Sequence, residues 1–230
     1  MPTDVSALQL VLTADPALMA IVRLSLLVSL LAVFFGALIG VPLGAGVALT
    51  QFRGREAMIV VLNALMGLPP VVVGLLVFLL LSRAGPLGSL GLLFTPQAMI
   101  VAQTILIAPI VAALTRQTVE DLWTEYRDEL DAMNVGPFRR IATLIWDGRF
   151  SLVTALLAGF GRAAAEVGAV LIVGGNIDGF TRVMTTAIAL ETSKGDLPLA
   201  IGLGLVLIAL VVAVNAAAWG LRRAGQRFAG

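Results

Sequence analysis

Four long stretches without a single charged residue dominate this 230-residue sequence. They cover residues 24–52, 57–82, 84–115 and 197–221. A bilayer core about 30 Å thick needs about 20 apolar residues in a helix to cross it, so each stretch is long enough to span a membrane. Hydrophobic residues make up 59% of the chain and charged residues only 13%, which is unlike a soluble domain. The sequence therefore predicts an all-α integral membrane protein.

About five membrane-spanning helices are expected, in a single transmembrane domain that covers residues 1–230. A fifth apolar stretch, residues 150–177, is interrupted only by Arg162 and Glu166. The Gly- and Pro-rich segment 84–96 is expected to be an external loop. We therefore place the spans near residues 24–50, 57–82, 97–116, 150–174 and 197–221. The apolar segment before them is too short to cross, so residues 1–20 are expected to lie in the membrane interface.

Several kinds of site are excluded because the necessary residue types are missing. The chain contains neither cysteine nor histidine, which rules out disulfides and the histidine-dependent proteases and hydrolases. No aspartate lies in an expected span, so an intramembrane aspartyl protease is disfavoured. The net charge of +1 and the single lysine give no support to nucleic-acid binding. The chain is therefore not expected to be an enzyme or to hold a metal ion.

The basic residues divide unequally between the two faces that five spans define. One face would carry four of them, at positions 23, 83, 182 and 194, and the other would carry ten arginines, at positions 53, 55, 116, 127, 139, 140, 149, 222, 223 and 227. Loops rich in Lys and Arg remain in the cytoplasm. This difference predicts an external N-terminus, a cytoplasmic C-terminus and a cytoplasmic segment 117–149.

Small residues in the first span indicate a packing face. Gly36, Gly40 and Gly44 recur at every fourth position, so they lie on one side of a helix. Such spacing lets another helix approach closely, which matters where lipid provides no hydrophobic drive for helix association.

Prolines lie well inside three successive spans, at Pro42, Pro69, Pro70 and Pro109. Each removes a backbone donor and is expected to bend or break its helix. Bent helices are compatible with a moving pathway, although proline is also common in ordinary spanning helices.

Arg162 and Glu166 are four residues apart, so on one helix they would share a face and could pair. Pairing would lower the cost of burying each charge in the membrane, about 2.5–3.5 kcal/mol on insertion scales. Two interpretations remain open. The pair is either a neutralised structural contact that faces protein, or it lines the route or gate for a charged solute.

The polar segment 116–149 is expected to form a helical hairpin. Apolar positions fall at helical spacing in its first half, at Leu122, Tyr126, Leu130 and Met133. Gly136 is expected to end this helix, because glycine suits the left-handed conformation of a helix cap. Pro137 cannot continue the helix. A second helix is expected at residues 138–146. The alternative is an ordinary solvated loop between two spans.

This chain lacks the Gly-x-x-x-x-Gly-Lys-Ser/Thr pattern of a nucleotide-binding P-loop. If transport needs ATP, a soluble partner must bind it, and the hairpin would give that partner a place to dock.

The hairpin sequence ELDAMNVGPFRRIATLIW (129–146) resembles the coupling loop of type I ABC importer permeases. That family has Glu-Ala-Ala followed four residues later by Gly. With Gly136 aligned, the Glu-Ala-Ala positions fall on residues 130–132, and Glu129 is one place early. The family's Leu-Pro is absent. The resemblance implies that the ATPase contacts lie at Glu129, Asp131, Ala132, Gly136, Pro137 and Arg139.

A second string is similar to the oxyanion branch of these permeases. Molybdate and sulfate permeases carry R-A-x-x-E-[FY]-G-A/S followed by G-N-I, and RAAAEVGA (162–169) with GGNI (174–177) reproduces this pattern. Valine after the glutamate, the doubled glycine and the segment 181–200 look most like tungstate-type permeases. GLPPVVVGL (67–75) also resembles this branch. The resemblance covers essentially the whole chain.

The resemblance implies a permease of the cell's inner (cytoplasmic) membrane, built as a homodimer around one path. An ABC ATPase dimer would dock on the coupling loops and use the ATP, while this chain binds no cofactor itself. An extracytoplasmic binding protein would deliver the oxyanion, with tungstate expected and molybdate or sulfate as alternatives. The pathway or gate would involve Arg162, Glu166, Asn176, Pro69 and Pro70. A passive channel or structural subunit is the remaining alternative.

Overall fold

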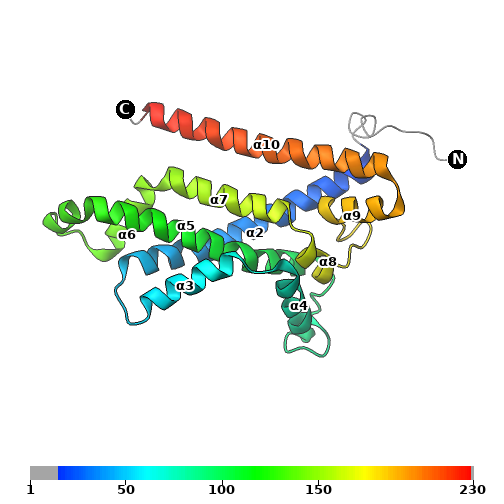
Figure 1. The fold of residues 1–230 in the computed structure, drawn as a ribbon, viewed down its shortest axis with the longest axis horizontal. Coiled ribbons are helices and arrows are strands. Elements are labelled where there is room, and N and C mark those ends of the chain that lie inside the picture. The colour runs from blue at the N-terminus through cyan, green and yellow to red at the C-terminus, as the bar shows by residue number, and fades with distance from the viewer. Residues whose placement is uncertain (1–14, 229–230) are drawn as a thin grey trace. The chain divides into compact units, whose positions relative to one another are not determined.

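The computed structural model describes residues 15–228, and every regular element in this range is helical. The elements are labelled in Figure 1: α2 (Pro16–Leu49), α3 (Arg55–Met66), α4 (Pro70–Leu81), the 3-10 turn η1 (Gly88–Leu90), α5 (Pro96–Ala132), α6 (Pro137–Asp147), α7 (Arg149–Ala164), α8 (Gly168–Gly174), α9 (Met184–Lys194) and α10 (Leu197–Phe228). The prediction of an all-α chain is confirmed.

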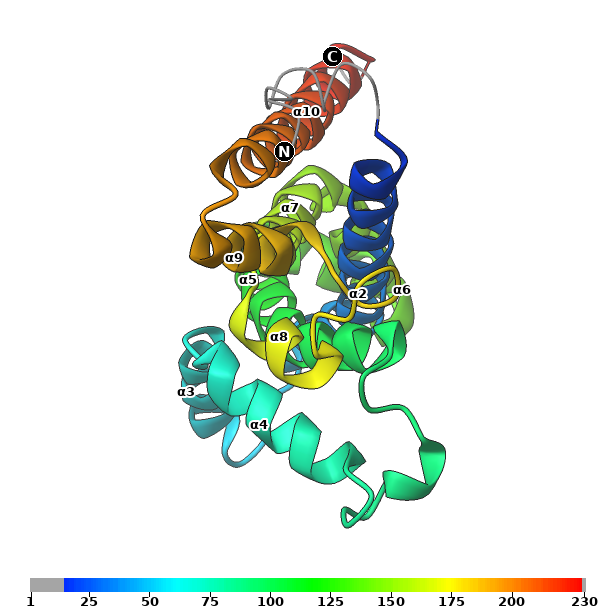
Figure 2. The same cartoon turned by 90° about the vertical axis from the view of Figure 1, so that its right-hand side faces the viewer.

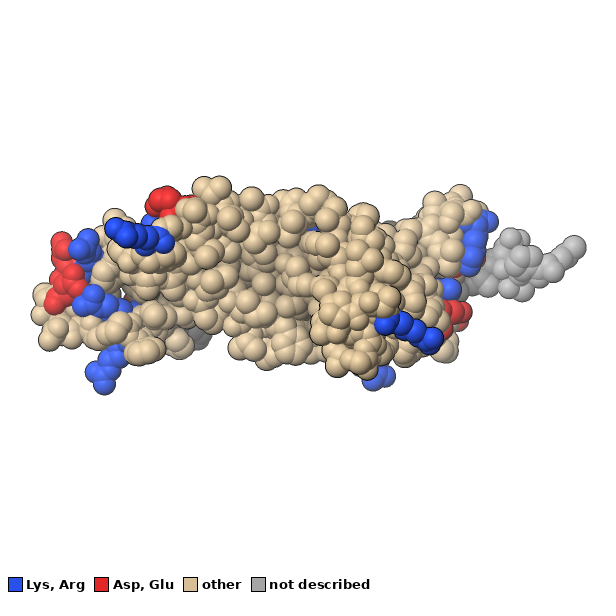
Figure 3. Space-filling model, turned by 90° about the horizontal axis from the view of Figure 1, so that it is seen from below, with Lys and Arg blue, Asp and Glu red and all other residues tan. Residues whose placement is uncertain are grey.

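Three of the described helices, α2, α5 and α10, are long and apolar enough to cross a membrane. The number rises to as many as five if two bent helix pairs, α3 with α4 and α6 with α7, each count as one span. On the face drawn in Figure 3, charged side chains lie in small groups separated by uncharged surface. Large apolar side chains are exposed along α2 and α10, including Leu38 (62%) and Ile208 (63%). An apolar exterior is stable in lipid rather than in water.

The structure gives the predicted segments the following helix boundaries. The spans predicted at 57–82 and 150–174 are each interrupted, after Met66 and after Ala164. The first half of the segment 117–149 is helical, because α5 continues without a break to Ala132. Of the predicted interfacial segment 1–20, residues 16–20 belong to α2, and residues 1–14 lie outside the described range.

The described residues divide into two compact units. Within the described range, the first unit takes its residues from positions 15–32, 69–103 and 163–228, and the second from Val33–Leu68 and Thr104–Arg162. Helices α2 and α5 contribute to both units.

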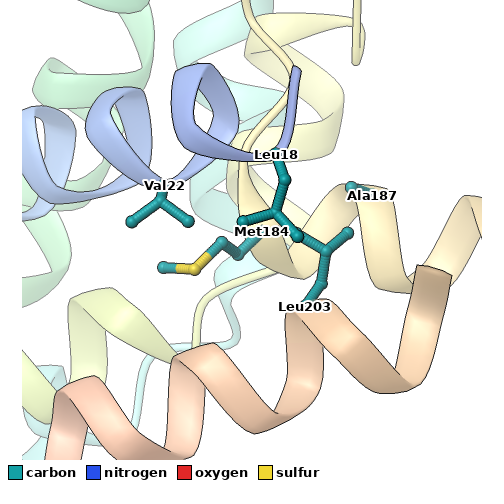
Figure 4. Close-up of a cluster of buried hydrophobic side chains, with 5 residues drawn as sticks. All are labelled: Leu18, Val22, Met184, Ala187 and Leu203. Carbon is teal, nitrogen blue, oxygen red and sulfur yellow. The ribbon is translucent and has the colours of Figure 1, made fainter. Parts of the chain in front are cut away.

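The core of the first unit joins the start of α2 to α9 and α10. Figure 4 shows this cluster of buried side chains, which consists of Leu18, Val22, Met184, Ala187 and Leu203. Figure 2 shows α9 directly before α10 in the chain and folded back beside it. The hydroxyl of Ser25 accepts a hydrogen bond from the Met184 backbone N at 2.7 Å and so fixes α2 against the start of α9.

The second unit is built on a close contact between α2 and α5. A Cβ atom added at Gly36 would lie 2.8 Å from Ile107 Cγ2, and one added at Gly40 would lie 2.7 Å from the Ala108 carbonyl oxygen. Gly44 is equally crowded by the backbone of α5. These distances leave no space for a side chain, so the three glycines set the separation of the two helices.

Candidate functional site

Two breaks interrupt the helices that carry the candidate pathway residues. The first lies between α3 and α4, where Pro69 is extended (φ −64°, ψ 121°) and Pro70 begins α4. Each proline disfavours a helical conformation in the residue before it, so Leu68 and Pro69 both leave the helix. The freed Leu68 carbonyl accepts a hydrogen bond from Arg162 Nη2 at 3.4 Å.

The second break follows α7 and contains Glu166. Arg162 is in the last turn of α7, but the helix ends at Ala164 and α8 begins only at Gly168. The two charged residues therefore do not share a helix face, which corrects the geometric basis of their expected pairing. The pairing itself stays a prediction.

Glu166 is 5% exposed. Its Oε1 accepts a hydrogen bond from the Ala169 backbone N at 3.0 Å, at the start of α8. A carboxylate at a helix start satisfies a free N–H group and is stabilised by the helix dipole. The backbone carbonyl oxygen of Glu166 accepts a hydrogen bond from Thr185 Oγ1 at 2.8 Å. Glu166 thus links α8 to α9 from the non-helical segment between α7 and α8.

A buried side-chain amide on α5 binds the last turn of α7, just before the second break. Gln103 is 3% exposed, and its Nε2 donates to the Ala163 carbonyl at 3.2 Å. The Glu166 backbone N donates to the same carbonyl, also at 3.2 Å. The unwound backbone after α7 is therefore paired, as low-polarity surroundings require.

Helices α4 and α8, which follow the two breaks, pack against each other through small residues (Figure 2). A Cβ added at Gly74 would lie 2.8 Å from Ala169 Cα, and one added at Gly168 would lie 2.8 Å from Val71 Cγ2. The glycines of the GLPPVVVGL and RAAAEVGA strings thus allow this close contact.

Asn176 lies just after α8, in a left-handed conformation (φ 51°) next to Gly175 (φ 71°). Its Nδ2 lies 3.5 Å from the Thr186 carbonyl, which it donates to, and its buried Oδ1 has no partner among the described residues. The Thr181 hydroxyl donates to the Gly174 carbonyl at 2.5 Å and closes the turn. Asn176 therefore belongs to a turn that ends α8 close to α9.

The hairpin between α5 and α6 is present, but it turns differently from the prediction. Asn134 takes the left-handed conformation (φ 50°), whereas Gly136 is extended (φ −69°, ψ 157°). The expectation of a left-handed Gly136 is wrong because Pro137 disfavours folded conformations in the preceding residue, while asparagine tolerates positive φ. The second helix, Pro137–Asp147, agrees closely with the predicted 138–146.

Arg140 holds the two arms of the hairpin together. Its Nη1 lies 2.8 Å from Asp131 Oδ1, and its Nε donates to the Val135 carbonyl at 2.6 Å. The guanidinium also lies 5.3 Å from the centre of the Trp123 ring, within the range of a cation–π contact. Below it, Leu130 and Leu144 pack with Val119 and the end of α2 in a shared core. The hairpin is therefore a packed element rather than a loose loop.

The residues matched to the ATPase contacts lie on the outside of this hairpin. All six are exposed: Glu129, Asp131, Ala132, Gly136, Pro137 and Arg139. Two apolar side chains between them are also exposed, Met133 (71%) and Phe138 (87%). Met133 was predicted to lie on the apolar face of the first helix, but it lies beyond the end of α5 and packs no core.

Sequence reasoning missed Gln103, Thr185 and Arg140. The first could have been found, because Gln103 is the single amide in the apolar stretch 98–115 and must bind something once it is buried. Nothing in the sequence distinguishes Arg140 from Arg139, and nothing places Thr185 beside residue 166, since both assignments depend on the folded chain.

The chain is closely similar to known membrane transport proteins, although no protein-family model matches it. It is 46% identical over 205 residues to a probable anion ABC transporter permease of Haloferax volcanii. This alignment covers 86% of this chain and 88% of that protein. It is 41% identical over 217 residues to the tungstate uptake permease TupB of Peptoclostridium acidaminophilum, over 94% of this chain and 95% of the relative. A molybdenum permease of Azotobacter vinelandii is 27% identical over 74% of this chain and 79% of its own length.

Among solved structures, the inward-facing MetNI methionine ABC transporter has the same fold. The TM-score is 0.68 at 19% sequence identity, and the match covers 91% of this chain and 98% of the other. Together with the apolar helices and the sequence relatives, this fold identifies a multi-pass membrane protein. The chain belongs to the ABC transporter permeases, in the oxyanion branch that includes the tungstate permeases.

Proposed function

We propose that this chain is the membrane subunit of an ATP-driven importer of tungstate. The observation that carries the proposal is its identity to a tungstate permease over nearly the full length of both proteins. Molybdate and sulfate are the alternative substrates, but permeases named for these anions align less extensively and at lower identity.

The proposed assembly contains two copies of this chain, two ABC ATPase subunits and an extracytoplasmic binding protein. The chain has no P-loop motif and binds no nucleotide itself, so the ATPase partners bind and hydrolyse the ATP. Selectivity among tetrahedral oxyanions belongs mainly to the binding protein, where hydrogen-bond donors can enclose the anion.

The orientation follows from the distribution of arginines. In this proposal the hairpin and the C-terminus are cytoplasmic and the N-terminus is external. The exposed Met133 and Phe138 on the hairpin support an ATPase contact there, because exposed apolar side chains among polar ones are typical of protein interfaces.

The continuous helix α5 offers a route from the ATPase to the pathway. It carries Gln103 near one end and the hairpin residue Asp131 at the other, without an interruption at Pro109. Movement of the hairpin would therefore be transmitted along α5 to the residue that holds the Ala163 carbonyl at the second break. We assign the gate to the two breaks, with Arg162, Glu166, Asn176, Pro69 and Pro70 as its residues.

Reconstitution of the chain in liposomes with its ATPase and binding protein tests this function. Tungstate is expected to stimulate ATP hydrolysis and to enter the vesicles at a lower concentration than molybdate, with sulfate weakest. Strongest stimulation by molybdate or sulfate would assign the alternative substrate. Anion flux that is independent of ATP would instead identify a passive channel.

A further inference from the structure

A pocket lies between the start of α2 and the turn that joins α8 to α9, wholly within the first unit. It has a volume of about 390 Å³, which falls in the range of roughly 300–1,000 Å³ that ligand sites occupy. None of the candidate pathway residues lines it. Its place on the chain and its lining point to a ligand other than the transported anion.

The pocket combines an apolar wall with two arginines. Six of its ten lining residues are apolar: Ala17, Ala20, Ile21, Leu24, Leu27 and Phe180. Arg23, Arg182 and Asp178 are also in the lining, so two positive charges and one negative charge leave a net charge of +1. A small hydrated oxyanion would gain nothing from the apolar wall, whereas an amphiphile with an anionic head would use both parts.

Both arginines retain capacity to bind an anion. Arg182 pairs with Asp178 through Nη1 at 3.0 Å, but its buried Nε has no hydrogen-bond partner among the described residues. The Arg23 side chain is exposed, and no residue in the described range forms an ion pair with it. Guanidinium groups bind phosphate oxygens with paired N–H donors.

The turn that carries Arg182 is held rigidly. The Ile177 carbonyl accepts hydrogen bonds from the backbone N atoms of Phe180, Thr181 and Arg182 at 3.2, 2.9 and 3.0 Å. Gly179 supplies the left-handed conformation (φ 69°) that this turn needs. The site is therefore formed in advance, which lowers the entropy cost of binding.

The position of the pocket along α2 fits the boundary of a membrane. Arg23 is the last charged residue before the uncharged stretch 24–52, and Leu24 and Leu27 lie inside that stretch. The pocket thus extends from a charged level to an apolar level, as the headgroup and acyl chains of a lipid do. We propose that it binds one anionic phospholipid of the adjacent leaflet, with the phosphate on Arg23 and Arg182 and an acyl chain along Ala20, Leu24 and Leu27.

The proposal is tested by native mass spectrometry on the full-length chain in a neutral detergent, titrated with phosphatidylglycerol or phosphatidylcholine. The wild type should bind the first phosphatidylglycerol about tenfold more tightly than phosphatidylcholine, since one additional charged contact corresponds to about this factor. Arg23→Gln and Arg182→Gln should each remove this preference. Arg83→Gln is the matched control, because Arg83 is exposed but lies outside the pocket.

Arg182→Gln removes the ion pair with Asp178 and could disturb folding. A variant of the apolar wall therefore provides a second test. Ala20→Trp fills the groove from the exposed side of α2 and should weaken both lipids about equally. An unchanged preference in Arg23→Gln, or unchanged binding of both lipids by Ala20→Trp, would overturn the proposal, as would an equal loss of preference in Arg83→Gln. Binding of inorganic phosphate alone, with the same arginine dependence and no lipid preference, would identify a small-anion site instead.

A different outcome is that the wild type binds no lipid while Arg23→Gln changes the oligomeric mass. That result would identify a contact between copies and would overturn the lipid assignment. The readout needs no transport, so its result is independent of which anion the chain carries.

Discussion

Glu166 is a nearly buried carboxyl group whose bonds hold two backbone segments at a helix break. Glutamine at this position keeps an acceptor oxygen for the Ala169 N–H group but removes the charge. If the charge takes part in gating, Glu166→Gln should lower uptake by reconstituted transporter about tenfold while the yield of folded protein is unchanged.

The second buried glutamate, Glu191, provides the control for this substitution. It is 6% exposed, lies on α9 and pairs with Lys194 at 2.9 Å. Glu191→Gln should leave uptake kinetics close to wild type. Wild-type kinetics in Glu166→Gln as well would return the Glu166 carboxylate to a purely structural role.

The glycines of α2 differ sharply in what surrounds them. A methyl group at Gly40 would collide with the Ala108 carbonyl and with Val111, whereas nothing lies within 4 Å of one at Gly46. We expect Gly40→Ala to lower the free energy of unfolding by about 1–3 kcal/mol through overpacking. Gly46→Ala should be neutral or stabilise by about 0.5–1 kcal/mol, because alanine favours helix. Detergent-mediated unfolding measures both, and equal effects would contradict the α2–α5 contact.

At the scale of whole elements, prolines alone do not explain where the helices break. Pro42 and Pro109 lie inside continuous helices, so neither proline breaks its helix. A single proline costs one backbone hydrogen bond, whereas the Pro69–Pro70 pair forces two successive residues out of helical geometry. Two adjacent prolines therefore predict this break, whereas a single proline inside a span does not.

The break after Ala164 has no local signal, since the sequence there is Ala-Glu-Val-Gly. It is stabilised by groups distant in sequence, namely the Gln103 amide on the Ala163 carbonyl and the Thr185 hydroxyl on the Glu166 carbonyl. Local propensity favours a continued helix, and tertiary hydrogen bonds override it. For this reason the sequence alone could not show that Glu166 lies beyond the end of the helix that carries Arg162.

The hairpin allows a direct test of partner contact, because Gly136 has ordinary backbone geometry and open surroundings. Its φ of −69° suits any residue, and an added Cβ meets nothing within 4 Å. Gly136→Trp should therefore fold and insert normally. If the ATPase docks here, co-purified ATPase should fall about tenfold, as for loss of an interface contact worth about 1.4 kcal/mol.

Gly220→Trp provides the comparison for this variant, since Gly220 on α10 is exposed and equally open. It should retain the ATPase at the wild-type level. Full recovery of ATPase with Gly136→Trp would place the dock elsewhere, and loss with both variants would indicate a general effect of the bulky side chain.

At the scale of the molecule, hydrophobicity predicts the membrane class, the start of α5 at the end of the 84–96 loop, and the second helix of the hairpin. These features depend on local composition and on turn residues such as Gly136 and Pro137. The division into two units could not be predicted, because α2 and α5 pass from one unit to the other inside uncharged stretches of the sequence. It depends on which distant residues pack together, such as Met184 on Leu18.

The proposed orientation can be tested on a chain that has no cysteine of its own. A single introduced cysteine is then the only thiol, and a membrane-impermeant maleimide reports which side it faces. Ser89 in the loop before α5 and Phe138 on the hairpin are both exposed, at opposite ends of α5. If ten arginines hold the hairpin in the cytoplasm, Ser89→Cys should label in intact cells and Phe138→Cys only after permeabilisation.

Val28→Cys supplies the baseline, because Val28 is 1% exposed and should label only after denaturation. Reversed labelling of Ser89→Cys and Phe138→Cys would invert the orientation and place the hairpin outside, where no cytoplasmic ATPase could reach it. Labelling of both from one side would show that α5 does not cross the membrane. Either result would remove the proposed path by which ATP hydrolysis in a docked ATPase acts through the hairpin and α5 on the break at Ala163.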